Sequence, residues 1–90
     1  MNIEFTDNGW DDFEYWMDVD NEMVEQIKEL IKDIRKTPFQ GLGKPEPLKH
    51  NLKGFRSRRI TQEHRVVYKV EGKKGANQKC TIIQCRYHYD

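Results

Sequence analysis

The chain has 90 residues, and its positive and negative side chains almost balance, leaving a formal net charge of +1. That length supports one modest hydrophobic core, so we expect a single domain over residues 1–90. No apolar run approaches the roughly 18 residues that a membrane-spanning helix needs, and no charged-then-apolar leader opens the sequence. We therefore expect a cytoplasmic protein with no membrane contact.

The cysteines and histidines argue against a disulfide or a metal site. Cys80 and Cys85 are five residues apart in a predicted strand, and an odd spacing sends the two side chains to opposite faces. The three histidines show no zinc-ligand spacing with the cysteines or with one another. The sequence therefore predicts two free structural thiols, no metal and no cofactor.

Charge is distributed very unevenly along the chain. Residues 1–33 contain eleven acidic side chains and only two lysines, whereas residues 34–90 contain fourteen Lys and Arg and four acidic side chains. A chain divided in this way turns its basic half toward nucleic acid. The acidic half faces away from the nucleic acid or toward a basic protein partner.

The N-terminal part predicts a strand followed by a helix. Apolar side chains alternate with polar ones over residues 1–6, as in a short strand with one buried face. Asp7 or Asn8 is the expected N-cap of the helix that follows. Its expected core stripe consists of Trp10, Phe13 and Met17, with Tyr15 and Trp16 at its sides.

A second helix is expected from a cap at Asp20 to about Lys36, where Thr37-Pro38 ends it. The two helices would form a hairpin that covers one face of a sheet. A DNA-reading helix-turn-helix is the alternative, but its acidic outer faces would repel phosphate. The apolar stripe of the second helix comprises Met23, Ile27, Leu30, Ile31 and Ile34.

The second half of the chain predicts a loop and then strands. A Gly- and Pro-rich loop is expected at 39–47, a brief strand at 48–52, strands at 55–61, 65–70 and 79–87, and a flexible hairpin tip at 72–78. The resulting order, β-α-α-β-β-β, indicates an α+β fold with a helical hairpin packed on a small, mainly antiparallel sheet.

The stretch from Lys44 to Tyr68 carries nearly half of the basic residues and only two acidic ones. One of these, Glu46, lies between two prolines, so we expect a carboxylate held in a rigid turn. Such a carboxylate beside many cations is typical of a proton acceptor that faces phosphate, although a solvated basic sheet face gives the same pattern. The basic residues that follow Glu46 in this stretch are Lys49, His50, Lys53, Arg56, Arg58, Arg59, His64 and Arg65.

These residue types match the requirements of a metal-free ribonuclease. Cleavage of RNA by its own 2′-hydroxyl needs a base, cations for the phosphorane-like transition state, and an acid for the departing 5′-oxygen. Glu46, then Arg65 with Arg59, and then His88 are candidates for these three roles.

Each candidate also has a simpler interpretation. Glu46 pairs with a neighbouring lysine in that interpretation, His88 is a frayed terminal residue, and Tyr87 and Tyr89 serve packing. Tyrosine can equally stack on an unpaired base.

The chain also resembles the Txe/YoeB toxins of bacterial toxin–antitoxin systems, which have a RelE-like fold. The resemblance extends over nearly the whole length and includes Trp10-Asp11-Asp12. The motifs that carry it are Lys44-Pro-Glu-Pro-Leu-Lys-His-Asn-Leu, Ser57-Arg-Arg-Ile-Thr, Glu63-His-Arg-Val-Val-Tyr and Cys85-Arg-Tyr-His-Tyr.

The resemblance implies a ribosome-dependent endoribonuclease (mRNA interferase) that cleaves mRNA in the A site without a metal and so inhibits translation. It assigns the general base to Glu46, transition-state stabilisation to Arg65 and the general acid to His88. Tyr89 would help to hold the substrate. Lys49 and Arg59 would add positive charge around the scissile phosphate.

The resemblance further implies a cognate YefM-like antitoxin of the Phd/YefM family, and a homodimer. The tip at 72–78 looks longer than is usual in these toxins, and Asp90 follows the terminal tyrosine. Two other functions stay open: a non-catalytic toxin on the same scaffold that inhibits gyrase, and a simple RNA-binding module.

Overall fold

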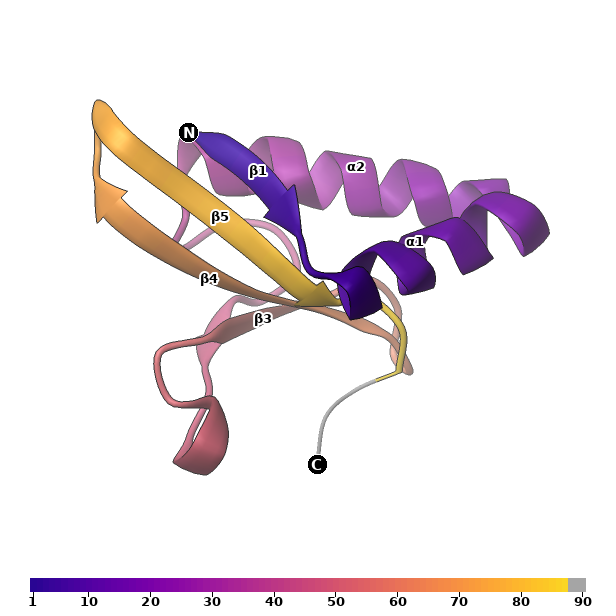
Figure 1. Ribbon diagram of the computed structural model, residues 1–90. Helices are drawn as coiled ribbons and strands as arrows, with labels where there is room; N and C mark the ends of the chain where they lie inside the picture. The colour runs from indigo at the N-terminus through magenta and orange to yellow at the C-terminus, as the bar shows by residue number, and fades with distance from the viewer. Residues whose placement is uncertain (88–90) are drawn as a thin grey trace.

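A computed structural model of the protein describes residues 1–87. Five strands form one sheet in the order β1-β5-β4-β3-β2, in which β1 runs parallel to β5 and the other neighbours are antiparallel. Figure 1 shows both helices on one side of this sheet. The predicted α+β fold is confirmed. The elements are β1 (Asn2–Phe5), α1 (Asp7–Val19), α2 (Asn21–Lys36), β2 (Glu46–Pro47), the 3-10 helix η1 (His50–Leu52), β3 (Arg56–Arg59), β4 (Arg65–Lys73) and β5 (Ala76–Gln84).

Helix α1 contacts the sheet through a different face from the one expected. Its N-cap is Thr6, whose hydroxyl accepts a hydrogen bond from the Gly9 amide. A Cβ at Gly9 would lie 2.3 Å from the Ile82 carbonyl oxygen, so only glycine lets the helix approach β5 so closely. Trp16, two turns further along this face, is the buried aromatic residue, whereas Trp10 is 43% exposed. The expected stripe through Trp10 and Met17 was therefore wrong.

Helix α2 agrees with the prediction at both ends. The Asp20 carboxylate accepts hydrogen bonds from the Glu22 and Met23 amides at 3.0 and 3.3 Å, as an N-cap should. The helix ends at Lys36. Its buried residues are Met23, Val24, Ile27, Leu30 and Ile34, so four of the five expected stripe residues are buried. Neither helix of the described chain is long and apolar enough to cross a membrane.

Three boundaries in the second half differ from the expectation. Residues 50–52 form η1 and not a strand, because the Leu48 amide bonds to the Phe55 carbonyl and closes a loop between them. Glu46 lies in the edge strand β2 and not in a turn. The expected flexible tip is mostly strand, since β4 reaches Lys73 and β5 starts at Ala76.

Both cysteines are free and buried in the same core cluster. The prediction of opposite faces was wrong because β5 ends at Gln84, so the strand alternation does not reach Cys85. Burial raises the pKa of each thiol to about 12. At neutral pH both thiols are therefore protonated packing groups.

A buried arginine joins α2, the loop after it and the sheet. The side chain of Arg58 in β3 is fully buried and forms an ion pair with Asp33 near the end of α2. It also donates to the Tyr68 hydroxyl at 3.1 Å, and that hydroxyl donates to the Pro38 carbonyl. Further acceptors are the backbone carbonyls of Thr37, Gln40 and Leu42. The expectation that Arg58 is one of the phosphate-facing cations was therefore wrong, because its side chain is buried on the helix side of the sheet.

We expect Arg58→Met to lower the free energy of unfolding by about 3 kcal/mol or more, because it leaves Asp33 and several carbonyls without their partner. Chemical denaturation measures the change. The matched control is Arg56→Met, since Arg56 lies on the same strand over the Phe39 ring. That variant should lose less than about 1 kcal/mol. An equal decrease in the free energy of unfolding in the two variants would contradict the stabilising role of the buried Arg58 contacts.

Asp33 should give the fold an acid-sensitive contribution. Its pKa is lowered from the ordinary value of 3.8, first by the Leu42 amide and then by Arg58. A lowered folded-state pKa gives stabilisation that is complete above the ordinary pKa and is lost as the pH falls through the lower one. The stability difference between wild type and Asp33→Asn should therefore shrink below pH 3.8. Denaturation at several pH values tests this, and a difference that grows on acidification would refute it.

Candidate functional site

The strand alternation separates a structural face of the sheet from a functional one. In β3, Arg58 points toward the helices, so its neighbours Ser57 and Arg59 point to the other face. Ser57 is opposite Glu46 of β2, and Arg59 is opposite Arg65 of β4. The sheet thus brings Glu46, Arg59 and Arg65 together on the face that the helices leave open.

A carboxylate and a guanidinium are in direct contact on this open face. Arg65 Nη1 lies 3.1 Å from Glu46 Oε1 and 3.2 Å from Ser57 Oγ. Glu46 is 54% exposed, whereas Arg65 is 17% exposed. The cation is therefore held by the protein, and the carboxylate stays accessible to a ligand. The pairing of Glu46 with a lysine, considered from the sequence, is not what the structure shows.

Arg59 and Lys49 differ in how closely the structure ties them to this pair. Arg59 is exposed and directly opposite Arg65, so the two side chains leave the same face of the sheet side by side. Lys49 is exposed just before η1. Within residues 1–87, no hydrogen bond or ion pair joins the Lys49 side chain to Glu46 or Arg65.

The chain after β5 is anchored beside Arg65 by several contacts. The Trp16 indole donates to the Cys85 carbonyl at 2.8 Å, and the Cys85 amide donates to Asp12 at 3.0 Å. The Tyr87 amide donates to His64 Nδ1 at 2.7 Å, and the Arg65 amide donates to the Tyr87 carbonyl at 3.0 Å. His64 is thus a local anchor and not part of an open basic cluster.

Side-chain stacking reinforces this anchor. The His64 ring packs edge-on against the Trp16 ring, with 4.8 Å between the ring centroids, and its centroid lies 5.5 Å from that of the Tyr87 ring. The Arg86 guanidinium lies 3.5 Å from the Tyr15 ring centroid and also contacts Tyr87. The last described residue is therefore fixed next to Arg65. The candidate acid His88, the candidate Tyr89 and Asp90 lie outside the described residues.

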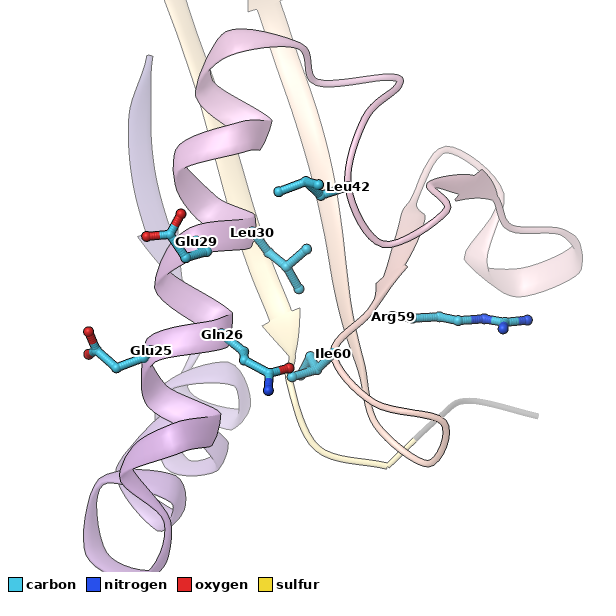
Figure 2. A pocket seen from close by; sticks show the side chains of 7 residues that line it. All are labelled: Glu25, Gln26, Glu29, Leu30, Leu42, Arg59 and Ile60. Carbon is cyan, nitrogen blue, oxygen red and sulfur yellow. The ribbon is translucent and has the colours of Figure 1, made fainter.

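A hollow of about 280 Å³ lies between α2 and β3, and Arg59 of the candidate site is among the residues that line it. Leu30, Leu42 and Ile60 give it apolar walls, and Glu25, Gln26 and Glu29 of α2 also line it. Figure 2 shows that the Arg59 guanidinium points away from this hollow. The hollow therefore offers an apolar recess without the facing base and cation found on the open sheet face.

Sequence reasoning missed three contributors to the site: Ser57, Trp16 and the backbone of Tyr87. Strand parity was the available signal for Ser57, because it is two residues from Arg59 and shares its face. The Trp16 contact with Cys85 links residues 69 positions apart, and no local pattern predicts it. Within the described part of the chain, no cluster of three His, Cys, Asp or Glu side chains is arranged to hold a metal ion.

Trp16→Phe should loosen the anchored segment while keeping the ring contact with His64. Loss of the indole N–H leaves the buried Cys85 carbonyl without its donor, at a cost of about 1–3 kcal/mol in the free energy of unfolding. Amide exchange at Cys85 and Tyr87 should become faster. Trp10→Phe, at an exposed position of the same helix, is the control. Unchanged exchange at Tyr87 in Trp16→Phe would show that other contacts hold the segment.

Comparison with known proteins agrees with this arrangement of sheet, helices and charged face. The profile of the YoeB-like toxins of bacterial type II toxin–antitoxin systems matches residues 5–89. The toxin YoeB of Escherichia coli K12 is 54% identical over 89 residues, covering 99% of this chain and all of the relative. A solved YoeB/ParE toxin from Agrobacterium tumefaciens superposes with a TM-score of 0.93 at 52% identity, covering 99% of this chain and all of the other.

A YoeB of Staphylococcus aureus has been solved as a dimer and in complex with YefM. The dimer structure superposes with a TM-score of 0.87 at 42% identity, covering 99% of this chain and 98% of the other. The toxin in the YefM complex superposes with a TM-score of 0.86 at 41% identity, covering 99% of this chain and 98% of the other. The 90-residue chain described here belongs to the YoeB-like toxin family of bacterial type II toxin–antitoxin systems.

Proposed function

We propose that this toxin is a ribosome-dependent endoribonuclease that cleaves mRNA in the A site and thereby inhibits translation in the cytoplasm. The observation that carries the proposal is the direct contact of Arg65 with Glu46, with Arg59 beside Arg65 on an open sheet face. This arrangement supplies a proton acceptor and two cations within one patch. Membership of the YoeB-like family supports the same reaction.

Glu46 acts as the general base in this proposal. Its carboxylate takes the proton of the 2′-hydroxyl, and the 2′-oxygen forms a bond to the adjacent phosphorus. A carboxylate is a modest base, so accurate placement of the RNA must supply part of the rate. The ribosome provides that placement by holding the codon in a fixed conformation. We accordingly expect little cleavage of free RNA.

Arg65 and Arg59 stabilise the negative charge that grows on the phosphate oxygens, and Lys49 adds to the positive field. His88 donates its proton to the 5′-oxygen as the bond from phosphorus to that oxygen breaks. Tyr89 holds the substrate. The products are a 2′,3′-cyclic phosphate, or a 3′-phosphate after its hydrolysis, and a 5′-hydroxyl. No step requires a metal ion.

We also propose a YefM-like antitoxin of the Phd/YefM family and a homodimer as the assemblies of this toxin. The S. aureus relative, solved with YefM and as a dimer, supports both. An acidic antitoxin segment would find complementary charge on the open sheet face. The exposed aromatic and apolar residues of α1 offer a surface for the second copy; they are Trp10, Tyr15, Met17 and Val19.

Primer extension on a defined mRNA tests the reaction, with programmed ribosomes in one arm and ribosome-free RNA in the other. Wild type should cleave at the A-site codon only with ribosomes. Treating the toxin with EDTA before the ribosomes are added should not change the cleavage. Glu46→Gln and His88→Ala should each lower the rate about 10²- to 10⁴-fold, and Arg65→Ala about 10²- to 10³-fold, because each removes one catalytic group.

Glu63→Gln is the matched control, since it removes an exposed carboxylate from the turn between β3 and β4. It should cleave at close to the wild-type rate. Intact mRNA in every lane would overturn the nuclease proposal, and loss of supercoiling by gyrase would then favour the gyrase inhibitor. Binding without cleavage would favour the RNA-binding module.

A further inference from the structure

We propose that Ser57 is a positioning residue that, together with Glu46, orients Arg65 so that the Nε–Nη2 edge of its guanidinium faces the scissile phosphate. The inference rests on the proposed nuclease function. It concerns a residue to which neither the sequence motifs nor the catalytic roles above assign a task. The guanidinium of Arg65 has five N–H groups, which the protein and the ligand share.

Sheet register places Ser57 where it can hold Arg65. Ser57 is paired with Glu46 on one side and with Val67 on the other. Arg65 is two residues before Val67, so it is the diagonal neighbour of Ser57 across the strand pair. Its side chain therefore crosses β3 above Ser57 to reach Glu46. A small residue at this position leaves room for the guanidinium.

One nitrogen of the Arg65 guanidinium, Nη1, has a protein acceptor for each of its N–H groups. Nη1 carries two N–H groups, and it contacts Ser57 Oγ at 3.2 Å and Glu46 Oε1 at 3.1 Å. Within residues 1–87, Nε and Nη2 donate to no protein acceptor. These two nitrogens form one edge of the planar group, and that edge has the spacing for bidentate contact with two phosphate oxygens.

Burial makes Ser57 the fixed member of this arrangement. Ser57 is 0% exposed, whereas Glu46 is 54% exposed on a two-residue edge strand. Glu46 must turn toward the 2′-hydroxyl to take its proton, and its contact with Nη1 weakens as it does so. The Ser57 hydroxyl then remains as the acceptor that keeps the guanidinium in its plane. Ser57 thus acts through Arg65 and not on the substrate.

Single-turnover cleavage on programmed ribosomes tests this role. Ser57→Ala should lower the maximal cleavage rate about ten- to hundredfold, because a misdirected guanidinium stabilises the transition state poorly. The toxin concentration for half-maximal rate should change less than about threefold, since Arg59 and Lys49 still attract the RNA when Arg65 is misdirected. Thr81→Ala, which removes a half-buried hydroxyl in β5 away from the site, should cleave within about twofold of wild type. An unchanged rate for Ser57→Ala would overturn the proposal.

A double-mutant cycle separates positioning from a merely structural effect. Lysine at position 65 keeps the charge but lacks the planar fork that Ser57 orients. In the Arg65→Lys background, Ser57→Ala should therefore cause less than about twofold further loss. The same fold loss in both backgrounds would show that Ser57 acts independently of Arg65, contrary to the proposal.

An assay without RNA distinguishes failure of this inference from failure of the nuclease proposal. The side-chain Nε–H resonance of Arg65 is followed by NMR during titration with inorganic phosphate. Wild type should show a saturable shift, and Ser57→Ala should need about tenfold more phosphate for the same shift. If wild type does not cleave mRNA but this difference is seen, only the nuclease proposal fails. Equal titrations for the two proteins would overturn the role of Ser57.

Discussion

The buried guanidinium of Arg58 is the interaction on which the remaining architecture depends. A charged group without water must find partners for all its N–H groups, and Arg58 finds them in Asp33, the Tyr68 hydroxyl and three backbone carbonyls. These acceptors come from the end of α2, the following loop and β4. One side chain thereby ties the end of the helix, the returning loop and the sheet to one another.

The position of Arg58 also determines where the candidate chemistry lies. Since neighbouring residues of a strand point to opposite faces, an inward Arg58 requires Ser57 and Arg59 to point outward. The antiparallel pairing with β4 then brings Arg65 beside Arg59, and the pairing with β2 brings Glu46 beside Ser57. The open face thus receives its charges as a consequence of packing on the other face. Stability and site geometry are coupled through a single strand.

The sequence predicted what local physics determines. The helical periodicity and the cap at Asp20 located α2 correctly. The sequence also named Glu46, Arg59 and Arg65 as candidates, but only the pairing of β2, β3 and β4 brings them to one face. Predictions from the sequence failed where long-range packing determines which side chains are buried. A count of basic residues cannot say that Arg58 is buried and Arg59 is exposed, because that depends on sheet register. The same limitation explains Trp16, whose burial follows from the close approach of Gly9 to β5.

The two-layer fold also explains how a nearly neutral chain presents a basic face. Ten of the eleven acidic residues within residues 1–33 lie in α1, in α2 or at the cap between them, and this helical hairpin covers one side of the sheet (Figure 1). Arg59 and Arg65 leave the other side. Most of these carboxylates are exposed to solvent, where charges more than about 8 Å apart are largely screened at physiological ionic strength. The helical carboxylates therefore cancel little of the positive potential at the open face. A polyanion approaching from that side meets a cationic surface, although the whole protein carries a net charge of only +1.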